Sequence, residues 1–223
     1  MDARRAAVLE ALGVERFEPR ARAAPGSAAA GAAEVATLGW EALEGAVSGC
    51  TRCTLAASRT QTVFGVGDRS ARWFVVGEAP GADEDRQGEP FVGRAGQLLN
   101  SMLRAIGLAR EQVYIGNVLK CRPPGNRDPL PEEVRCCLPY LHRQLALVAP
   151  RLILCLGRIA AQNLLATDTP IGKLRGQVHR HAAFAAPVIV TYHPAYLLRS
   201  PGEKRKVWED LRFAMEVARG DSA

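Results

Sequence analysis

Short apolar runs alternate with amphipathic segments along this chain, and this alternation constrains the fold more than any other feature. The predicted strands are 73–77, 113–118, 152–156 and 187–191. The predicted helices lie near 94–107, 132–148, 157–166 and 203–219. Such an order predicts a three-layer α/β/α fold around a central, mainly four-stranded parallel sheet.

A stretch rich in glycine, proline and carboxylates, residues 77–93, follows the first predicted strand. We expect a long loop that leaves the carboxyl end of the strand and enters the helix at 94–107. Ligands of α/β sheets bind at that edge. No Gly-x-Gly-x-x-Gly or Walker sequence occurs, so the sequence gives no support for a nucleotide cofactor.

Length and composition predict one domain with an appendage. Residues 1–37 are rich in Ala, Arg and Pro and are expected to form a flexible N-terminal extension, whereas residues 38–219 would form the domain, beginning with a helix over 38–49. No membrane span or secretory signal is evident, which favours a cytoplasmic protein. The net charge of +6 and the pI of about 9.2 favour a polyanionic partner.

Six cysteines are many for a chain without an export signal. Cys155 lies inside an apolar strand and is expected in the core. Cys50, Cys53 and Cys121, with either Cys136 or Cys137, would supply four thiolates for a zinc ion or an iron–sulfur cluster, and the single Cys-x2-Cys pair favours the cluster. Cys137 lies beside the apolar stripe of its helix, which favours it over Cys136.

Chemically useful side chains collect just after the predicted strands. Glu78 follows the first strand and leads on to Phe91, Asn117 ends the second, and His193 follows the fourth. Because the carboxyl ends of parallel strands meet at one edge, we expect these groups to lie together there.

Four motifs in order resemble the family 4 uracil-DNA glycosylases, the iron–sulfur members of the uracil-DNA glycosylase superfamily. They are Gly-Glu-Ala-Pro-Gly-Ala-Asp-Glu-Asp at 77–85, Pro-Phe-Val-Gly-Arg-Ala-Gly-Gln-Leu-Leu at 90–99, Asn-Val-Leu-Lys-Cys-Arg-Pro-Pro at 117–124 and His-Pro-Ala-Tyr-Leu-Leu-Arg at 193–199. The resemblance covers residues 45–217. It implies hydrolysis of the N-glycosidic bond of deoxyuridine in DNA, which leaves an abasic site for base excision repair.

The resemblance also implies a 4Fe-4S cluster with a structural role. Its ligands would be Cys50, Cys53, Cys121 and Cys137. Cys136, beside Cys137, remains an alternative fourth ligand.

The same resemblance assigns roles around a uracil that is flipped out of the DNA. Phe91 would stack on the base, the Asn117 amide would read its O4 and N3–H, and His193 would donate to its O2. The loop at 77–85 would hold the attacking water. Its candidate residues are the carboxylates Glu78, Glu84 and Asp85 and the backbone of Gly77, Ala79 and Gly81.

The segment after His193 is expected to contact DNA. Leu197, Leu198 and Arg199 would wedge into the gap left by the flipped base. Lys204 and Lys206 would meet phosphates at the start of the last helix.

Two other interpretations remain open. One is a protein that binds uracil-containing or damaged DNA without turnover, and the other is a polymerase-associated module on the same fold. Some iron–sulfur relatives bind uracil-DNA covalently through a histidine on an insertion, but residues 121–137 contain no histidine, which favours ordinary turnover. The partner would be single- or double-stranded uracil-containing DNA, and the chain would act as a monomer.

Overall fold

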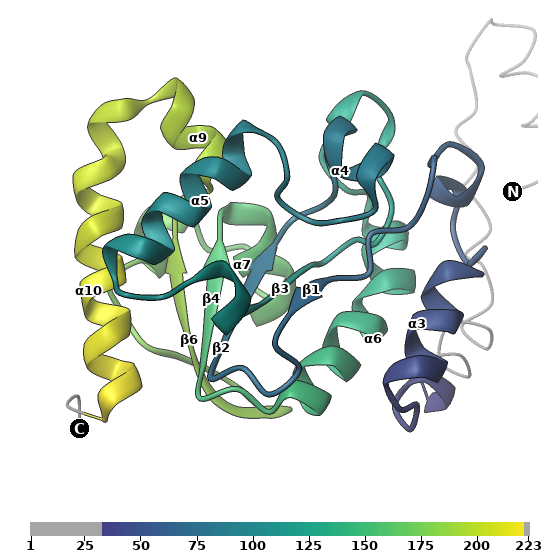
Figure 1. Cartoon of the computed structure of the whole chain (residues 1–223), viewed down its shortest axis with the longest axis horizontal. Coiled ribbons are helices and arrows are strands. Elements are labelled where there is room, and N and C mark those ends of the chain that lie inside the picture. The colour runs from purple at the N-terminus through teal and green to yellow at the C-terminus, as the bar shows by residue number, and fades with distance from the viewer. Residues whose placement is uncertain (1–32, 221–223) are drawn as a thin grey trace, which may run out of the picture.

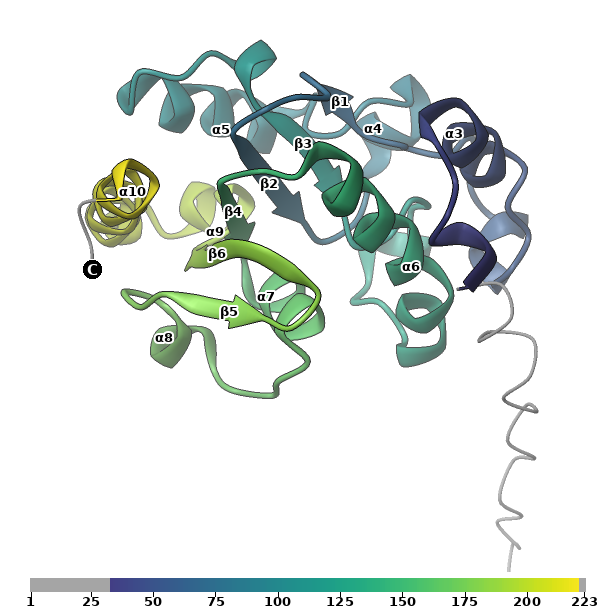
Figure 2. The ribbon, with the colours of Figure 1, turned by 90° about the horizontal axis from the view of Figure 1, so that it is seen from below.

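The computed structural model describes residues 33–220. Most of the expected extension, residues 1–32, therefore lies outside the described part of the chain. Within it, a six-stranded sheet has the order β1-β3-β2-β4-β6-β5. Figures 1 and 2 show this sheet between two layers of helices, so the predicted three-layer α/β/α fold is confirmed.

The four predicted strands form the parallel centre of the sheet. They are β2 (Trp73–Gly77), β3 (Tyr114–Asn117), β4 (Leu152–Leu156) and β6 (Phe184–Thr191). Two short antiparallel strands that we did not predict complete the edges, β1 (Val66–Gly67) beside β3 and β5 (His179–His181) beside β6. The sheet is thus mixed, with a parallel core.

Alternate side chains of each strand point to opposite faces and build two cores. On one face, Phe74 and Val76 of β2 pack with the layer formed by α3 (Trp40–Ser48), α6 (Pro131–Val148), α7 (Arg158–Leu165) and α8 (Ile171–Leu174). On the other, Trp73 and Val75 pack with α5 (Arg94–Ala105), α9 (Pro194–Arg199) and α10 (Lys204–Arg219).

We expected a long loop at 77–93, but this stretch contains the helix α4 (Ala82–Gln87). The Glu84 carboxylate accepts a hydrogen bond from the Gly81 amide at 3.1 Å and so caps the first turn. Gly88 ends the helix with a φ of 75°. With only six residues, α4 has no apolar period by which the sequence would reveal it.

Short 3-10 turns connect the larger elements. They are η1 (Thr54–Ala57), η2 (Arg110–Gln112), η3 (Pro124–Asn126) and η4 (Pro201–Glu203). Within residues 33–220 no helix combines the length and apolar character that a membrane crossing requires.

Candidate functional site

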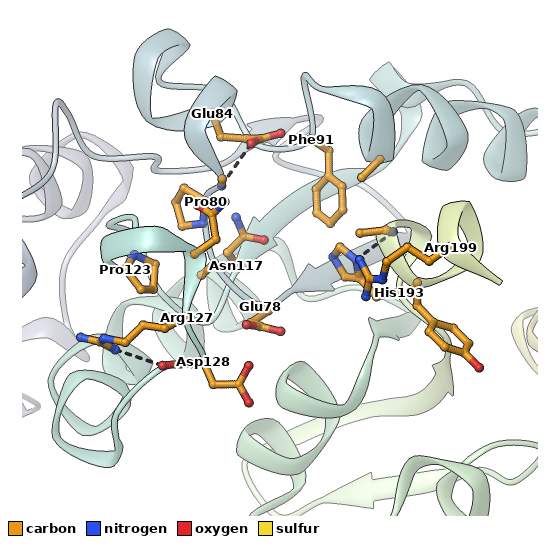
Figure 3. A pocket seen from close by; sticks show the side chains of 16 residues that line it. Glu78, Pro80, Glu84, Phe91, Asn117, Pro123, Arg127, Asp128, His193 and Arg199 are labelled. Carbon is orange, nitrogen blue, oxygen red and sulfur yellow. Dashed lines mark hydrogen bonds between the residues drawn. The ribbon is translucent and has the colours of Figure 1, made fainter.

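The carboxyl ends of β2, β3 and β6 open into one cavity of about 420 Å³ (Figure 3). Several residues that the sequence singled out line it together. They are Glu78, Ala79, Gly81, Glu84, Phe91, Asn117, His193 and Arg199. Gly77 is not among the lining residues but contacts two of them, because a β-carbon there would stand 2.2 Å from Asn117 Oδ1 and 2.7 Å from the Phe91 ring.

Asn117 occupies the floor of this cavity. It ends β3, pairs in register with Gly77 of β2, and is 2% exposed. Its Oδ1 atom is buried and has no hydrogen-bond partner among residues 33–220. A buried amide oxygen without a partner costs about 1–3 kcal/mol, so its retention in a cavity points to a ligand that donates a hydrogen bond there.

Phe91 and His193 line the same cavity, with their ring centroids 5.6 Å apart and their planes 30° from parallel. Phe91 adopts a left-handed φ of 56°, which is unfavourable for an aromatic residue. The conformation brings its carbonyl against Gly96, where a β-carbon would stand only 1.8 Å from the Phe91 oxygen. The loop therefore holds the ring over the cavity at a conformational cost.

The His193 imidazole is held in one orientation. Its Nδ1 accepts a hydrogen bond from the Ala195 amide at 3.1 Å at the start of α9. Nδ1 therefore carries no proton in the neutral ring, and Nε2 carries it. Burial, with a smaller contribution from the Arg199 charge, lowers the pKa of His193 to about 4. At neutral pH the ring is an uncharged donor through Nε2–H.

Glu78 has an environment that favours proton transfer. The pKa of its carboxyl is raised to about 7, chiefly by burial and next by the negative charge of Asp128, while the positive charge of Arg158 acts in the opposite direction. Figure 3 shows Glu78 on the side of the cavity that Asp128 also lines. A carboxyl group with a pKa near 7 is suited to accept a proton from water at physiological pH.

The other two candidate carboxylates have structural partners. Glu84 lines the cavity, but its oxygens accept hydrogen bonds from the amides of Gly81, Val92 and Gly93 at 3.0–3.2 Å. Asp85 is not among the cavity-lining residues: it is buried and accepts from the Thr60 amide with both oxygens, at 3.0 and 3.1 Å. Our expectation that Asp85 faces the water is therefore corrected, since adjacent residues of a helix point about 100° apart.

The DNA-contacting segment is also only partly as expected. Leu197 is 1% exposed and packs in the core with α5 and α10, so it is unavailable for insertion between bases. Leu198 is 38% exposed. Lys206 forms an ion pair with Glu203 at 2.8 Å, and Lys204 lines a separate apolar groove beside Trp208.

The sequence did not reveal the wall formed by residues 123–128. Pro123, Asn126, Arg127 and Asp128 all line the cavity. Arg127 is anchored by Glu133 at the start of α6, at 2.6 and 2.9 Å, and Asp128 pairs with Arg158 at 2.7 Å. The Arg-Pro-Pro sequence after Cys121 was the available signal, but it does not show which way the loop turns.

A second, smaller cavity is lined by five of the six cysteines, namely Cys50, Cys53, Cys121, Cys136 and Cys137. Cys137 is buried and its Sγ accepts a hydrogen bond from the Lys120 amide at 3.1 Å. Cys136 instead donates to the Arg52 carbonyl at 3.2 Å. Among residues 33–220, no three Cys, His, Asp or Glu side chains are arranged around a single metal-ion position.

Lys120 connects the two cavities. Its buried ammonium group donates to the Asn117 carbonyl at 2.9 Å and to Gln144 Oε1 at 2.6 Å. Since its own amide bonds Cys137, residues 117–121 join the cavity floor to the cysteines through buried backbone.

Comparison with known proteins places this chain in a family. The family model described as "Uracil DNA glycosylase superfamily" matches residues 64–212. A type-4 uracil-DNA glycosylase of Archaeoglobus fulgidus is 49% identical over 77% of this chain and 89% of its own length. One of Thermotoga maritima is 44% identical over 75% of this chain and 88% of its own length. The chain belongs to the type-4 uracil-DNA glycosylases of the uracil-DNA glycosylase superfamily.

Proposed function

We propose that this protein removes uracil from DNA by hydrolysing the N-glycosidic bond, which leaves an abasic site for base excision repair. The observation that carries the proposal is the buried Oδ1 of Asn117, which has no hydrogen-bond partner among residues 33–220 and lies in the cavity that Phe91 and His193 also line. Uracil offers an N3–H to such an acceptor, whereas cytosine has no proton there. Discrimination by a buried polar group of this kind is strong, because the wrong base leaves the group unpaired.

The base reaches the cavity only after its nucleotide leaves the DNA stack. Phe91 then stacks on the ring, and the Asn117 amide pairs with N3–H and O4. Nε2–H of His193 donates to O2, where negative charge develops as the base departs. Because His193 is neutral, it stabilises this charge as a hydrogen-bond donor through Nε2–H and keeps its proton.

Water completes the hydrolysis at C1′ of the sugar. We assign Glu78 as the residue that polarises this water, because its pKa of about 7 leaves it able to accept a proton. Glu84 supports the amides of Gly81, Val92 and Gly93 and so shapes the water-binding loop. In this proposal Leu198 and Arg199 face the gap left by the flipped base, and Lys204 and Lys206 contact the DNA phosphates.

Cys50, Cys53, Cys121 and Cys137 would hold a 4Fe-4S cluster. The donor set fits, because these thiols line one small cavity and iron–sulfur clusters are bound by four cysteine thiolates. When bound, the cluster would tie residues 50–53 to the segment after β3. The substrate would be single- or double-stranded uracil-containing DNA, and we propose a monomer that acts in the cytoplasm.

The decisive experiment measures base release from oligonucleotides that contain one uracil, one hypoxanthine, or one thymine opposite guanine, in single and double strands. We expect free uracil and an alkali-labile site. Asn117→Ala and His193→Ala should each lower the single-turnover rate by about 100-fold or more. Asn163→Ala is the matched control, because this amide bonds Ile159 on α7, outside the cavity.

Each other outcome is informative. Retention of uracil-DNA without base release would support the non-turnover binding protein, and the absence of both would leave the polymerase-associated module. Wild-type rates in both site variants would refute the assignment of Asn117 and His193 while leaving the activity in place.

The cluster has a separate test. Protein purified without oxygen should show a broad absorbance band at about 400 nm, as iron–sulfur proteins do. Replacing Cys50 and Cys53 together should remove this absorbance. Cys137→Ala should also lose it, whereas Cys136→Ala should keep it. If Cys136→Ala lost the absorbance and Cys137→Ala kept it, Cys136 would be the fourth ligand. Active protein that is colourless and contains zinc would refute the iron–sulfur cluster.

A further inference from the structure

One guanidinium group behind the cavity collects four acceptors, three from the loop that carries Phe91 and one from α5. Arg110 begins η2, and its side chain is 15% exposed. Its Nη2 donates to the Pro90 carbonyl at 2.5 Å and pairs with Glu89 Oε1 at 2.9 Å. Its Nη1 donates to the Phe91 carbonyl at 3.4 Å and to Asn100 Oδ1 at 3.3 Å.

The backbone segment that Arg110 holds is strained at Phe91 and would move to a lower-energy conformation if it were released. Phe91 has a φ of 56°, in the left-handed region, which costs a non-glycine residue about 1–2 kcal/mol. Gly96 leaves room for the Phe91 carbonyl but forms no side-chain contact that would hold it. Glu84 holds the amides of Val92 and Gly93 that follow Phe91. Arg110 adds the side-chain hold on the Pro90 and Phe91 carbonyls, from a position 19 residues after Phe91 in the chain.

We propose that Arg110 is a positioning residue for the glycosylase reaction. It fixes the backbone at 89–91, so that the Phe91 ring faces the flipped base. The effect of Arg110 on base release rests on the proposed function, whereas its effect on the position of the Phe91 ring does not. Arg110 does not line the cavity and therefore acts through Phe91.

The geometry requires arginine. A guanidinium presents donors in a rigid, planar fork that serves two acceptors on each terminal nitrogen, whereas a lysine ammonium is a single point on a flexible stem. Arg110→Lys keeps the charge and the pairing with Glu89 but loses the simultaneous hold on Pro90 and Phe91. This variant separates backbone positioning from electrostatics.

Fluorine NMR tests the structural step without any activity. The protein is made with 4-fluorophenylalanine, and the Phe91 signal among the six phenylalanines is assigned with Phe91→Leu. We expect a shifted signal for Phe91 in the wild type, and a broadened signal that moves toward the free amino acid in Arg110→Ala and Arg110→Lys. Guanidinium chloride at about 10 mM should restore it in Arg110→Ala, because the ion replaces the missing group.

Base release tests the functional step. Arg110→Ala should lower the single-turnover rate by about 100-fold, since small misplacements have effects of that size. In a Phe91→Ala background it should cause no further loss. Arg104→Ala is the matched control, because the exposed Arg104 side chain donates to Ser101 of its own helix and not to the loop that carries Phe91.

A Phe91 signal that stays at its wild-type position in folded Arg110→Ala and Arg110→Lys overturns the proposal. Additive losses in the double variant overturn it as well, because Arg110 would then act by another route. If the wild type releases no uracil, the proposed function fails, while the fluorine signal still decides whether Arg110 positions Phe91.

Discussion

The Oδ1 atom of Asn117 lies 2.2 Å from the position that a β-carbon on Gly77 would occupy. The two residues pair across β2 and β3, so the Asn117 amide uses space that only a glycine leaves free. Gly77→Ala would push the amide and the Phe91 ring out of place.

We expect Gly77→Ala to lower base release by about 100-fold. The free energy of unfolding should fall by no more than about 3 kcal/mol, because the neighbours that must move are side-chain ends. Gly172→Ala is the control, since a β-carbon there meets no atom within 4 Å. A Gly77→Ala variant with wild-type turnover would show that Asn117 reads the base from another position.

The pH dependence of the reaction should report Glu78. Its carboxyl must be ionised to accept a proton, so the single-turnover rate should rise with pH through about 7. Asp128→Asn removes a negative charge that raises the pKa of Glu78 and should move this rise to lower pH. Arg158→Gln removes a positive charge that lowers the pKa and should move the rise to higher pH. Glu78→Gln should abolish the rise. Movement of the profile in the same direction in both neighbour variants would assign it to another group.

Leu197 and Leu198 should give opposite phenotypes. Leu197→Ala removes a buried side chain and should lower the free energy of unfolding by about 2–5 kcal/mol. Leu198→Ala should change that free energy by less than about 0.5 kcal/mol and weaken binding to uracil-containing duplex. Urea denaturation and fluorescence anisotropy measure the two effects. Unchanged DNA affinity in Leu198→Ala would remove this residue from the proposed wedge.

Acid should destabilise the fold through His142. Burial, together with the charge of His181, lowers the pKa of His142 from 6.5 to about 4. Between these values the unfolded chain binds a proton that the folded chain does not, so the free energy of unfolding should fall as the pH drops from 6.5 to 4. His142→Leu should reduce this pH dependence in denaturation measured at several pH values. Part of it should remain, because the pKa of His193 is also lowered to about 4. A slope identical in wild type and His142→Leu would contradict the prediction.

The sequence predicted the fold where apolar periods are long and failed where elements are short. The parallel strands and the long helices α5, α6 and α10 carry enough residues to show a period. The helices α4, α8 and α9 have four to six residues, and the edge strands have two and three, which is too few.

The same limit explains the misplaced site residues. Glu78 and Asn117 lie at or just after strand ends, whose direction is fixed by the parallel sheet, and the structure brings them to one cavity. Asp85 and Leu197 lie on the unpredicted helices α4 and α9. If these segments were extended loops, Asp85 and Leu197 would lie beside the site residues next to them in the sequence. Because the segments are helical, the two side chains turn toward the core instead.

Asn117 and Cys121 stand at the two ends of one buried stretch of chain, the first on the floor of the large cavity and the second on the wall of the cysteine cavity. An inserted or deleted residue between them would change the register of one cavity against the other, and Lys120 would lose its bond to either the Asn117 carbonyl or Cys137. Natural variation in chain length should therefore be absent from residues 117–121. It should instead be tolerated at the turn between β5 and β6, where the chain reverses at the surface.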